Sequence, residues 1–210
     1  SPQNWGARGA NHTVDQQRHI FLGSLTIMVP IFAACQRFDF QRGEAWAHYV
    51  AWSGYAHLSE VVSMDTTLCP SLIDALIDED WNFNIHANNR VHYFRDYEYL
   101  KRRIAYDAAQ HNLLALIEAP DRQLSISDAW PRAFSFCGYD ILDVNNSISL
   151  LLNCGAFPSI FGPEDVNRFG LLNQFARAVE IARNLRQQFP DDFHCGDCRI
   201  WAIARYTSPA

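Results

Sequence analysis

The sequence lacks the short motifs from which a reaction is most easily inferred. It has no glycine-rich phosphate loop, no G-x-S-x-G nucleophile motif, no H-E-x-x-H zinc motif and no EF-hand loop. Nothing in the sequence therefore points to a phosphate-loop enzyme, a serine hydrolase with a nucleophile elbow, a zincin or a calcium-loop protein. These absences do not exclude an enzyme of another kind.

Charged residues are few, and acidic residues outnumber basic ones. They make up 19% of the 210 residues, and 17 Lys and Arg against 23 Asp and Glu give a formal net charge of −6. Because no basic stripe is present to contact phosphates, we expect no nucleic acid partner. An acidic protein more naturally meets a basic protein or a cation.

Long apolar runs and dense cysteine spacing are also missing. The uncharged segment from Ile20 to Cys35 falls short of the roughly 20 residues of a bilayer span and contains Pro30, so we expect no membrane helix. The six cysteines do not have the spacing of a disulfide scaffold, which favours a reducing, cytoplasmic location. Secretion is the alternative, in which case Asn11 and Asn145 would match the glycosylation pattern.

The most informative stretch that is present runs from Phe134 to Cys154. Two apolar segments flank Asn145 and Asn146, and Asn readily takes the positive φ that a two-residue turn needs, so this stretch predicts a β-hairpin. The turn places Cys137 opposite Cys154, which allows either a cross-strand disulfide or, as we favour in a reducing cell, two small core residues.

The predicted register sorts the hairpin side chains into two faces. Tyr139 and Leu150 belong to the face expected to lie on the core. Asp140, Ser149 and Asn153 belong to the other face, which is expected to look outward.

Apolar periodicity predicts the remaining elements. Expected strands are His19 to Phe40 with a bend at Pro30, Asn112 to Glu118, and Arg199 to Tyr206; expected helices are Glu44 to Val62, Pro70 to Ile77, Phe94 to Ile104, and Pro163 to Phe189. Together they predict a flexible tail over 1–13 and a single α+β domain over 14–210. We expect a mainly antiparallel sheet built around the central hairpin, with helices packed on one face.

Cys69 is the candidate nucleophile, because it precedes Pro70 where a helix is expected to begin. Backbone N–H groups and the helix dipole at such a position lower the pKa of a thiol and make its thiolate more nucleophilic. We take His86 as the candidate base, with His57 and His92 as alternatives. The structural interpretation of Cys69 is a small apolar residue at a helix entry.

A second cysteine motif lies near the C-terminus, where His194, Cys195 and Cys198 could supply ligands to zinc. A second pair of ligands is missing from the sequence. Zinc is therefore considered but not favoured, and a tight turn leading into the last strand is the alternative.

Carboxylates form two further candidate sites. Asp140, Asp143 and Asn153 could gather at the polar end of the hairpin as a cation site or an acid/base pair. The acidic run Asp78, Glu79 and Asp80 could be a docking patch for a basic partner. Solvated surface is the alternative interpretation of both groups.

These patterns favour an acidic, aromatic-rich interaction domain that engages a macromolecular partner, such as a basic protein, as a toxin-neutralising or adaptor protein would. The alternative is a hydrolase or transferase that uses a Cys/His pair or a metal-assisted carboxylate site.

Overall fold

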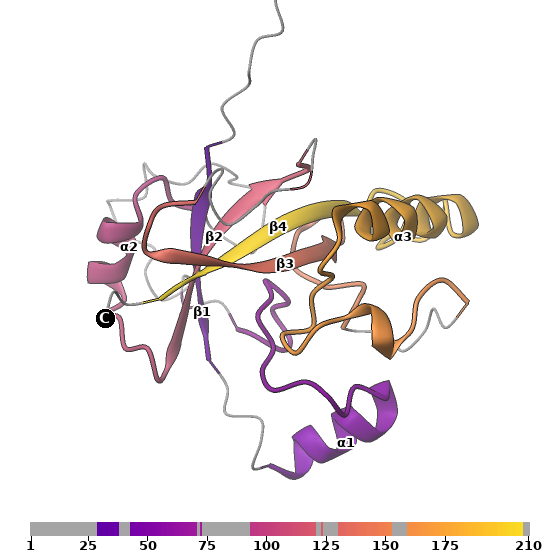
Figure 1. Ribbon diagram of the computed structural model, residues 1–210, viewed down its shortest axis with the longest axis horizontal. Coiled ribbons are helices and arrows are strands. Elements are labelled where there is room, and N and C mark those ends of the chain that lie inside the picture. The colour runs from indigo at the N-terminus through magenta and orange to yellow at the C-terminus, as the bar shows by residue number, and fades with distance from the viewer. Residues whose placement is uncertain are drawn as a thin grey trace, which may run out of the picture.

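Four strands form one antiparallel sheet in the part of the chain that the structure describes. The computed structural model describes residues 29–37, 43–70, 72, 93–120, 123, 130–152 and 159–207. The strands are β1 (Ile31–Gln36), β2 (His111–Glu118), β3 (Phe134–Leu142) and β4 (Arg199–Tyr206), in the order β1-β2-β4-β3 (Figure 1). The described helices are α1 (Glu44–Ser53), α2 (Tyr97–Arg103) and α3 (Phe175–Gln188), with a 3-10 turn, η4 (Pro163–Asp165). This arrangement confirms the predicted α+β fold.

The two inner strands, β2 and β4, carry the most continuous apolar runs. β2 is buried from Asn112 to Ile117 and pairs with β1 along one edge and with β4 along the other. β4 is buried from Trp201 to Ala204 and pairs antiparallel with both β2 and β3. A short run that is apolar at every position is typical of a strand covered on both faces. The predicted strands at these two places are confirmed.

The predicted turn at Asn145 and Asn146 is confirmed. Asn146 takes a φ of 54° and its N–H donates to the carbonyl of Asp143 at 2.9 Å. Leu142 pairs with Ser149 in an isolated bridge, as the predicted register requires. Asparagine therefore supplies the left-handed residue that reverses the chain.

The hairpin does not lie at the centre of the sheet, however. β3 is an edge strand whose sheet partner is β4, and the arm after the turn contributes only the isolated bridge. Tyr139 pairs with Leu172, with N–H to carbonyl distances of 2.8 and 2.9 Å, and not with Leu152. The expected central hairpin is therefore corrected to a tight turn at the edge of the sheet.

All three described helices are shorter than their periodicity predicts. α1 ends where Gly54 takes a φ of 76° and its N–H donates to Val50, a left-handed termination that glycine makes at little cost. α3 starts at Phe175 because the segment before it is used in the bridge between Leu172 and Tyr139. α2 lies within its predicted range and is capped by Asp96, whose side chain accepts the N–H groups of two first-turn residues.

The helices meet the sheet in different places. α2 contacts β1 and β2, and α3 contacts β3 and β4. α1 lies apart from the sheet (Figure 1), and the hydroxyl of Tyr49 on this helix donates to the carbonyl of Leu152 at 2.9 Å. The packing of helices on one face stays a prediction. Within the described ranges, no helix has the length and apolarity to cross a membrane.

Candidate functional site

Cys69, the predicted nucleophile, is buried with an exposed fraction of 2%. Its thiol donates to the carbonyl of Val61 at 3.5 Å. Burial raises the pKa of Cys69 well above its usual range, and the neighbouring Cys35 adds to this shift. A thiol in this environment stays protonated near neutral pH and is a poor nucleophile. The expected lowering of its pKa at a helix start is therefore wrong.

Several predicted site residues lie outside the described part of the chain. These are the candidate base His86, the amide Asn153, and the acidic run Asp78, Glu79 and Asp80. Cys154, the expected neighbour of Cys137, also lies outside it, while Cys137 itself carries a free thiol. The docking patch on the acidic run and the proposed Cys/His pair stay predictions.

Asp140 does not look outward but is fully buried. Its carboxylate accepts hydrogen bonds from the hydroxyls of Ser63 at 2.5 Å and Ser149 at 2.6 Å, and from the N–H of Ile141 at 2.8 Å. Burial raises its pKa to about 7, and these three donors oppose that rise. The expected outward face of the hairpin is wrong, because the segment that contains Ser63 covers it. Tyr139 and Leu150 are buried as predicted.

Two further buried carboxylates bind backbone N–H groups. Asp65 accepts from the N–H of Ser149 at 2.9 Å with one oxygen and caps the turn at Thr67 with the other. Asp143 accepts from the N–H of Ser147 at 2.9 Å, across the Asn-Asn turn. Short polar side chains commonly satisfy turn backbone in this way. Asp65, Asp140 and Asp143 thus hold the chain around the turn in place.

His194 contacts one of these carboxylates. Its Nδ1 lies 3.3 Å from Oδ2 of Asp143, and the exposed fractions of the two side chains are 42% and 1%. A buried carboxylate that holds one imidazole nitrogen is the orienting half of many catalytic sites. The partial arrangement becomes a reaction site only with a nucleophile beside the second nitrogen.

The predicted zinc ligands do not converge. Cys195 and Cys198 are buried, and the thiol of Cys198 points to the carbonyl of Ala182 at 3.8 Å. Burial raises the pKa of Cys198, which disfavours the thiolate that zinc requires. In the described ranges, no group of three or more His, Cys, Asp or Glu side chains is placed to hold a metal ion. His194 turns instead toward Asp143.

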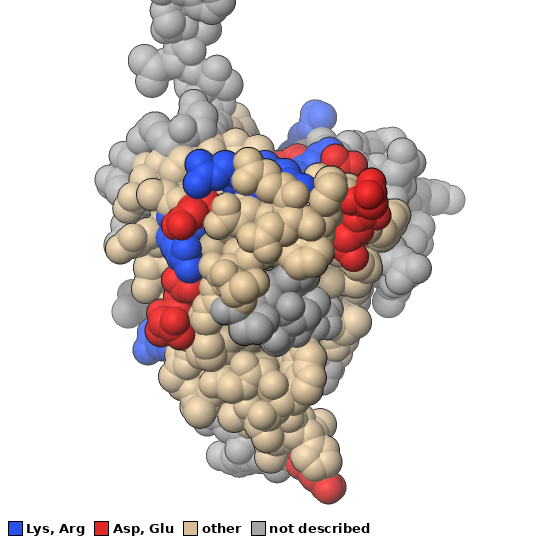
Figure 2. Space-filling model, turned by 90° about the vertical axis from the view of Figure 1, so that its right-hand side faces the viewer, with Lys and Arg blue, Asp and Glu red and all other residues tan. Residues whose placement is uncertain are grey.

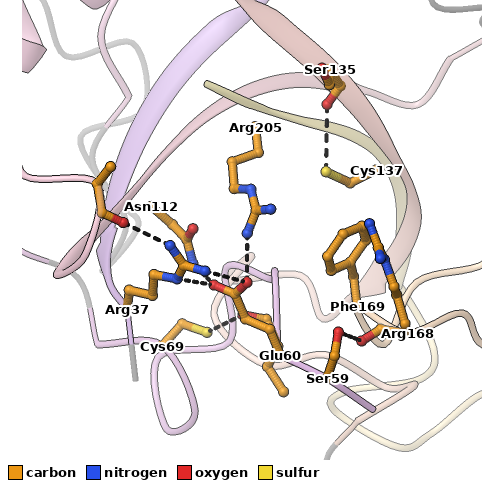
Figure 3. Close-up of polar contacts among 12 residues, drawn as sticks. Arg37, Ser59, Glu60, Cys69, Asn112, Ser135, Cys137, Arg168, Phe169 and Arg205 are labelled. Carbon is orange, nitrogen blue, oxygen red and sulfur yellow. Dashed lines mark hydrogen bonds and ion pairs between the residues drawn. The ribbon is translucent and has the colours of Figure 1, made fainter. Parts of the chain in front are cut away.

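A partly buried ion-pair cluster that the sequence did not reveal forms at one end of the sheet (Figure 3). Glu60, with a side chain 10% exposed, receives Nε of Arg37 at 2.7 Å and Nη1 of Arg205 at 2.6 Å. The amide of Asn112 donates to the same carboxylate at 3.3 Å. Arg37 follows β1, Asn112 lies in β2 and Arg205 lies in β4, so Glu60 ties three adjacent strands together.

Arg168 and Phe169 extend this cluster toward solvent. The guanidinium carbon of Arg168 lies 4.6 Å from the ring centroid of Phe169, and that of Arg205 lies 5.1 Å from the same centroid. The backbone carbonyl of Arg168 accepts the N–H of Ser59 at 2.9 Å and so fixes this pair beside Glu60. We call Arg37, Glu60, Asn112, Arg168, Phe169 and Arg205 the arginine cluster.

A shallow cavity of about 230 Å³ lies before α3. Arg177 forms a bidentate pair with Asp165 there, at 2.8 and 2.9 Å, and this pair lowers the pKa of Asp165. The remaining lining residues are Glu164, Leu172, Asn173 and Gln174. Because Arg177 also binds Glu180 at 2.9 Å, its charge is already matched within the chain.

The second surface that the sequence did not single out is α1. Trp46, Tyr49 and Trp52 follow one another along this helix with ring centroids 5.5 and 6.2 Å apart, and Trp52 is 59% exposed. α1 lies at the bottom of the molecule in Figure 1. In the lower half of Figure 2, most of the described surface that is visible consists of uncharged residues. We call the exposed side of α1 the aromatic helix surface.

Comparison with known proteins gave no match: no protein-family model, no curated protein and no solved structure matches the chain.

Proposed function

We propose that this protein is an interaction domain that docks a protein partner through the aromatic helix surface. The observation that carries the proposal is the exposed side of α1, on which Trp52, 59% exposed, lies among small apolar residues while Trp46 and Tyr49 pack against the core. Glu44 is the one charged residue of α1, and Ser53 is its one buried residue, in a helix that is described throughout. A large exposed aromatic side chain on a helix that is held in place by its other side is a common anchor of a protein interface, so a second molecule is the natural cover.

The composition of α1 suits an interface. Trp and Tyr are enriched among the residues that contribute most binding energy, since they bury a large area and keep a polar atom for a hydrogen bond. The partly buried rings of Trp46 and Tyr49 support Trp52, which stands out toward solvent. Trp52 is therefore the proposed anchor residue.

The helix is held in position before any partner arrives. Tyr49 is tied to Leu152 by its hydroxyl, and just beyond the helix the buried Tyr55 donates to the carbonyl of Leu151 at 2.5 Å. Gly54 stops the helix between these two anchors. A preorganised helix loses little conformational freedom on binding, which favours affinity.

The partner we propose is a protein with an apolar groove and a basic rim. An apolar groove accommodates a helix of this kind, and the net charge of −6 attracts a basic surface. A lipid surface suits α1 less well, because helices that lie on membranes carry Lys or Arg on their polar side and α1 carries none. A toxin-neutralising or adaptor role in the cytoplasm fits such a partner.

The alternative, a hydrolase or transferase, has less support. Its nucleophile Cys69 is buried and protonated, and its carboxylate Asp140 is enclosed by hydrogen bonds.

Matched substitutions of two exposed aromatic residues test the proposal. Trp52 is 59% exposed and Phe193 is 64% exposed, so Trp52→Glu and Phe193→Glu remove similar surface at different places. Each variant, with a photo-crosslinking residue at Ala45, serves as bait in a lysate of the source cells. We expect the same crosslinked basic protein with the wild type and Phe193→Glu, weaker at high salt, and none with Trp52→Glu.

Three results would overturn the proposal. Equal crosslinking by Trp52→Glu would remove the aromatic helix surface from the interface. A crosslinked product that contains two copies of this chain would make the occupant a second copy. Sedimentation with anionic vesicles that Trp52→Glu abolishes would make it a lipid surface.

A further inference from the structure

Two buried carboxylates lie on either side of Ser149. The N–H of Ser149 donates to Oδ2 of Asp65 at 2.9 Å, and its hydroxyl donates to Oδ1 of Asp140 at 2.6 Å. All three residues are fully buried. Because two negative charges this close in the interior are unfavourable, one of the two carboxyl groups is expected to keep its proton near neutral pH. We call Asp65 and Asp140 the aspartate pair.

Asp140 is the member of the pair that keeps its proton. Its hydrogen-bond donors are uncharged: they are the hydroxyls of Ser63 and Ser149 and the N–H of Ile141. Burial raises the pKa of Asp140 to about 7 against the effect of these donors, and the charge of Asp65 adds to the rise. Near neutral pH, Asp140 therefore stands between its protonated and its ionised form.

α1 faces the aspartate pair from one side. Burial, the neighbouring Tyr55 and the charges of the pair all raise the pKa of Tyr49, because the hydroxyl of this residue lies close to both carboxylates. From the other side, the β4 residue that pairs with Asp140 is Trp201, which carries no charge that would compensate its ionisation. A change in the charge of Asp140 is therefore felt most directly where α1 is attached.

The attachment of α1 lies just beyond Ser149. The hydroxyl of Tyr49 donates to the carbonyl of Leu152 at 2.9 Å, and that of Tyr55 donates to the carbonyl of Leu151 at 2.5 Å. Both acceptors are within three positions of the serine that joins the aspartate pair. If the chain opens at Ser149, it takes the acceptors of both tyrosines with it.

Other contacts that fix α1 are few. The rings of Trp46 and Tyr49 pack partly buried against the core, the one buried residue of the helix is Ser53, and its N-cap Gly43 makes no side-chain hydrogen bond. Elements with few buried contacts open locally, at a lower cost in free energy than unfolding of the whole protein. α1 can therefore detach while the sheet stays folded.

Ionisation of Asp140 favours this detachment. The folded protein keeps the proton of Asp140 up to about pH 7, whereas a carboxyl group in water loses its proton near about pH 4. An opening that lets water reach Asp140 therefore releases a proton. Such an opening becomes more frequent as the pH rises from about 4 to about 7, and its frequency levels off above about pH 7.

We propose that the aspartate pair controls how firmly α1 is held, so that the protonated pair fixes the aromatic helix surface for docking and ionisation of Asp140 loosens it. This regulation rests on the docking function proposed above. The loosening of α1 can be measured without a partner, so the two can fail separately.

Hydrogen–deuterium exchange of the full chain between about pH 5 and about pH 8 tests the loosening. Protection factors remove the direct effect of pH on the exchange chemistry. We expect the protection factor of α1 to fall by up to about tenfold for each pH unit up to about pH 7 and to level off above it. α2 is the internal reference, because it packs against β1 and β2, away from β3, and we expect it to change less.

Three substitutions separate the charge of Asp140 from its place in the fold. Asp140→Asn should abolish the pH dependence of α1, and Asp197→Asn, which changes an exposed carboxylate, should keep it. Asp65→Asn removes the neighbouring charge, so Asp140 should ionise more easily and the protection of α1 should level off at a lower pH. Thermal unfolding at about pH 5 shows whether each variant is folded.

Constant protection of α1 over this pH range would overturn the inference. So would an equal fall in α2, which would mean that the whole protein loses stability, or a pH dependence that Asp140→Asn retains. Each of these results leaves the proposed docking untouched.

Crosslinking from Ala45 at about pH 6 and about pH 8 tests the consequence for docking. We expect the wild type to yield less of the crosslinked partner at the higher pH and Asp140→Asn to yield equal amounts, since docking follows the fraction of molecules in which α1 is in place. Equal yields from the wild type would overturn the regulation. No crosslinked partner at either pH would overturn the proposed docking and leave the exchange result standing.

Discussion

Glu60 and Arg205 lie 145 positions apart in the sequence and meet at 2.6 Å between Oε2 and Nη1. Arg37 binds the same carboxylate at 2.7 Å, so Glu60 is the common partner of two strands. This relationship predicts how removal of the negative charge of Glu60 changes the free energy of unfolding. Breaking a fully buried pair destabilises a protein by about 3–5 kcal/mol, but the side chains of Arg37 and Arg205 are 37% and 21% exposed, so solvent reduces the loss here.

Glu60→Gln is therefore expected to lower the free energy of unfolding by about 2 kcal/mol, between the values of exposed and fully buried pairs. Urea denaturation followed by circular dichroism measures this value. The control is Glu98→Gln. Oε2 of Glu98 lies 3.9 Å from Nζ of Lys101, and the Glu98 side chain is 49% exposed. Exposed pairs of this kind contribute about 0–1 kcal/mol. Equal losses in the two variants would show that the Glu60 carboxylate is not structurally important.

Asp140 predicts a pH dependence of stability. Burial raises the pKa of Asp140 from its ordinary value of 3.8 to about 7 in the folded protein. Between these values the folded state holds a proton that the unfolded state has lost, so the contribution of Asp140 to stability is full below about pH 4 and is lost as the pH rises through about 7. The slope from this group has a limit of about 1.4 kcal/mol per pH unit.

Asp140→Asn removes the titrating group but keeps a side chain of the same shape. We expect the free energy of unfolding of the variant to change less steeply between about pH 4 and about pH 7 than that of the wild type. Denaturant titrations at a series of pH values measure the difference. The exposed Asp197, changed to Asn, should leave the wild-type slope intact. A wild-type slope retained by Asp140→Asn would contradict the assignment.

The turn at Asn145 and Asn146 could be predicted from the sequence, but the environment of Asp140 could not. The reversal at Asn145 and Asn146 was predictable because turn formation is local and Asn favours the required φ. The burial of Asp140 was not, because its partner Ser63 lies 77 positions away and alternation along a strand says nothing about what covers each face.

The same limit applies to the helices and to the arginine cluster. Apolar periodicity correctly predicted β2, β4 and α2, because in each of them the same pattern of apolar residues continues along the whole element. It extended α3 too far toward its N-terminus because the Leu172 to Tyr139 bridge depends on a distant strand. Glu60 lay within the predicted helix from Glu44 to Val62, which in fact ends at Ser53, and its pairing with the distant Arg205 left no local signal in the sequence.

Cys69 should be protected from alkylation in the folded protein. It is 2% exposed and burial raises the pKa of its thiol, so both access and thiolate population are low. Iodoacetamide labelling followed by mass spectrometry should modify Cys69 much faster in denaturant than in buffer. Rapid labelling of Cys69 in the native protein would restore it as a candidate nucleophile.

The hydrogen bond from Trp201 to Asn146 is expected to stabilise the core. Its ring is fully buried and stacks on Tyr93 with centroids 5.5 Å apart, and its Nε1 donates to Oδ1 of Asn146 at 3.1 Å. Trp201→Phe keeps an aromatic ring but leaves the buried Asn146 oxygen without this donor. We expect a loss of about 1–3 kcal/mol in the free energy of unfolding. Stability unchanged in a urea titration would mean that the turn oxygen finds another donor.

Gly138 has a backbone that only glycine adopts readily. It follows the irregularity in the β3 to β4 pairing, with a φ of 145°, and an added Cβ would lie 2.7 Å from Cβ of Leu171 and 2.8 Å from the carbonyl of Leu172. Gly138→Ala therefore strains the backbone and pushes the Leu172 segment away from Tyr139. We expect a loss of at least about 2 kcal/mol in the free energy of unfolding.

Gly43→Ala is the control for this substitution, because nothing lies within 4 Å of a Cβ at that position. It adds the same methyl group before α1, where the backbone has a φ of −116° that alanine adopts without strain. Urea denaturation of the two variants separates the steric effect from the general effect of removing a glycine. If both lost the same stability, close contact of Gly138 with the Leu171 and Leu172 segment would not be the cause.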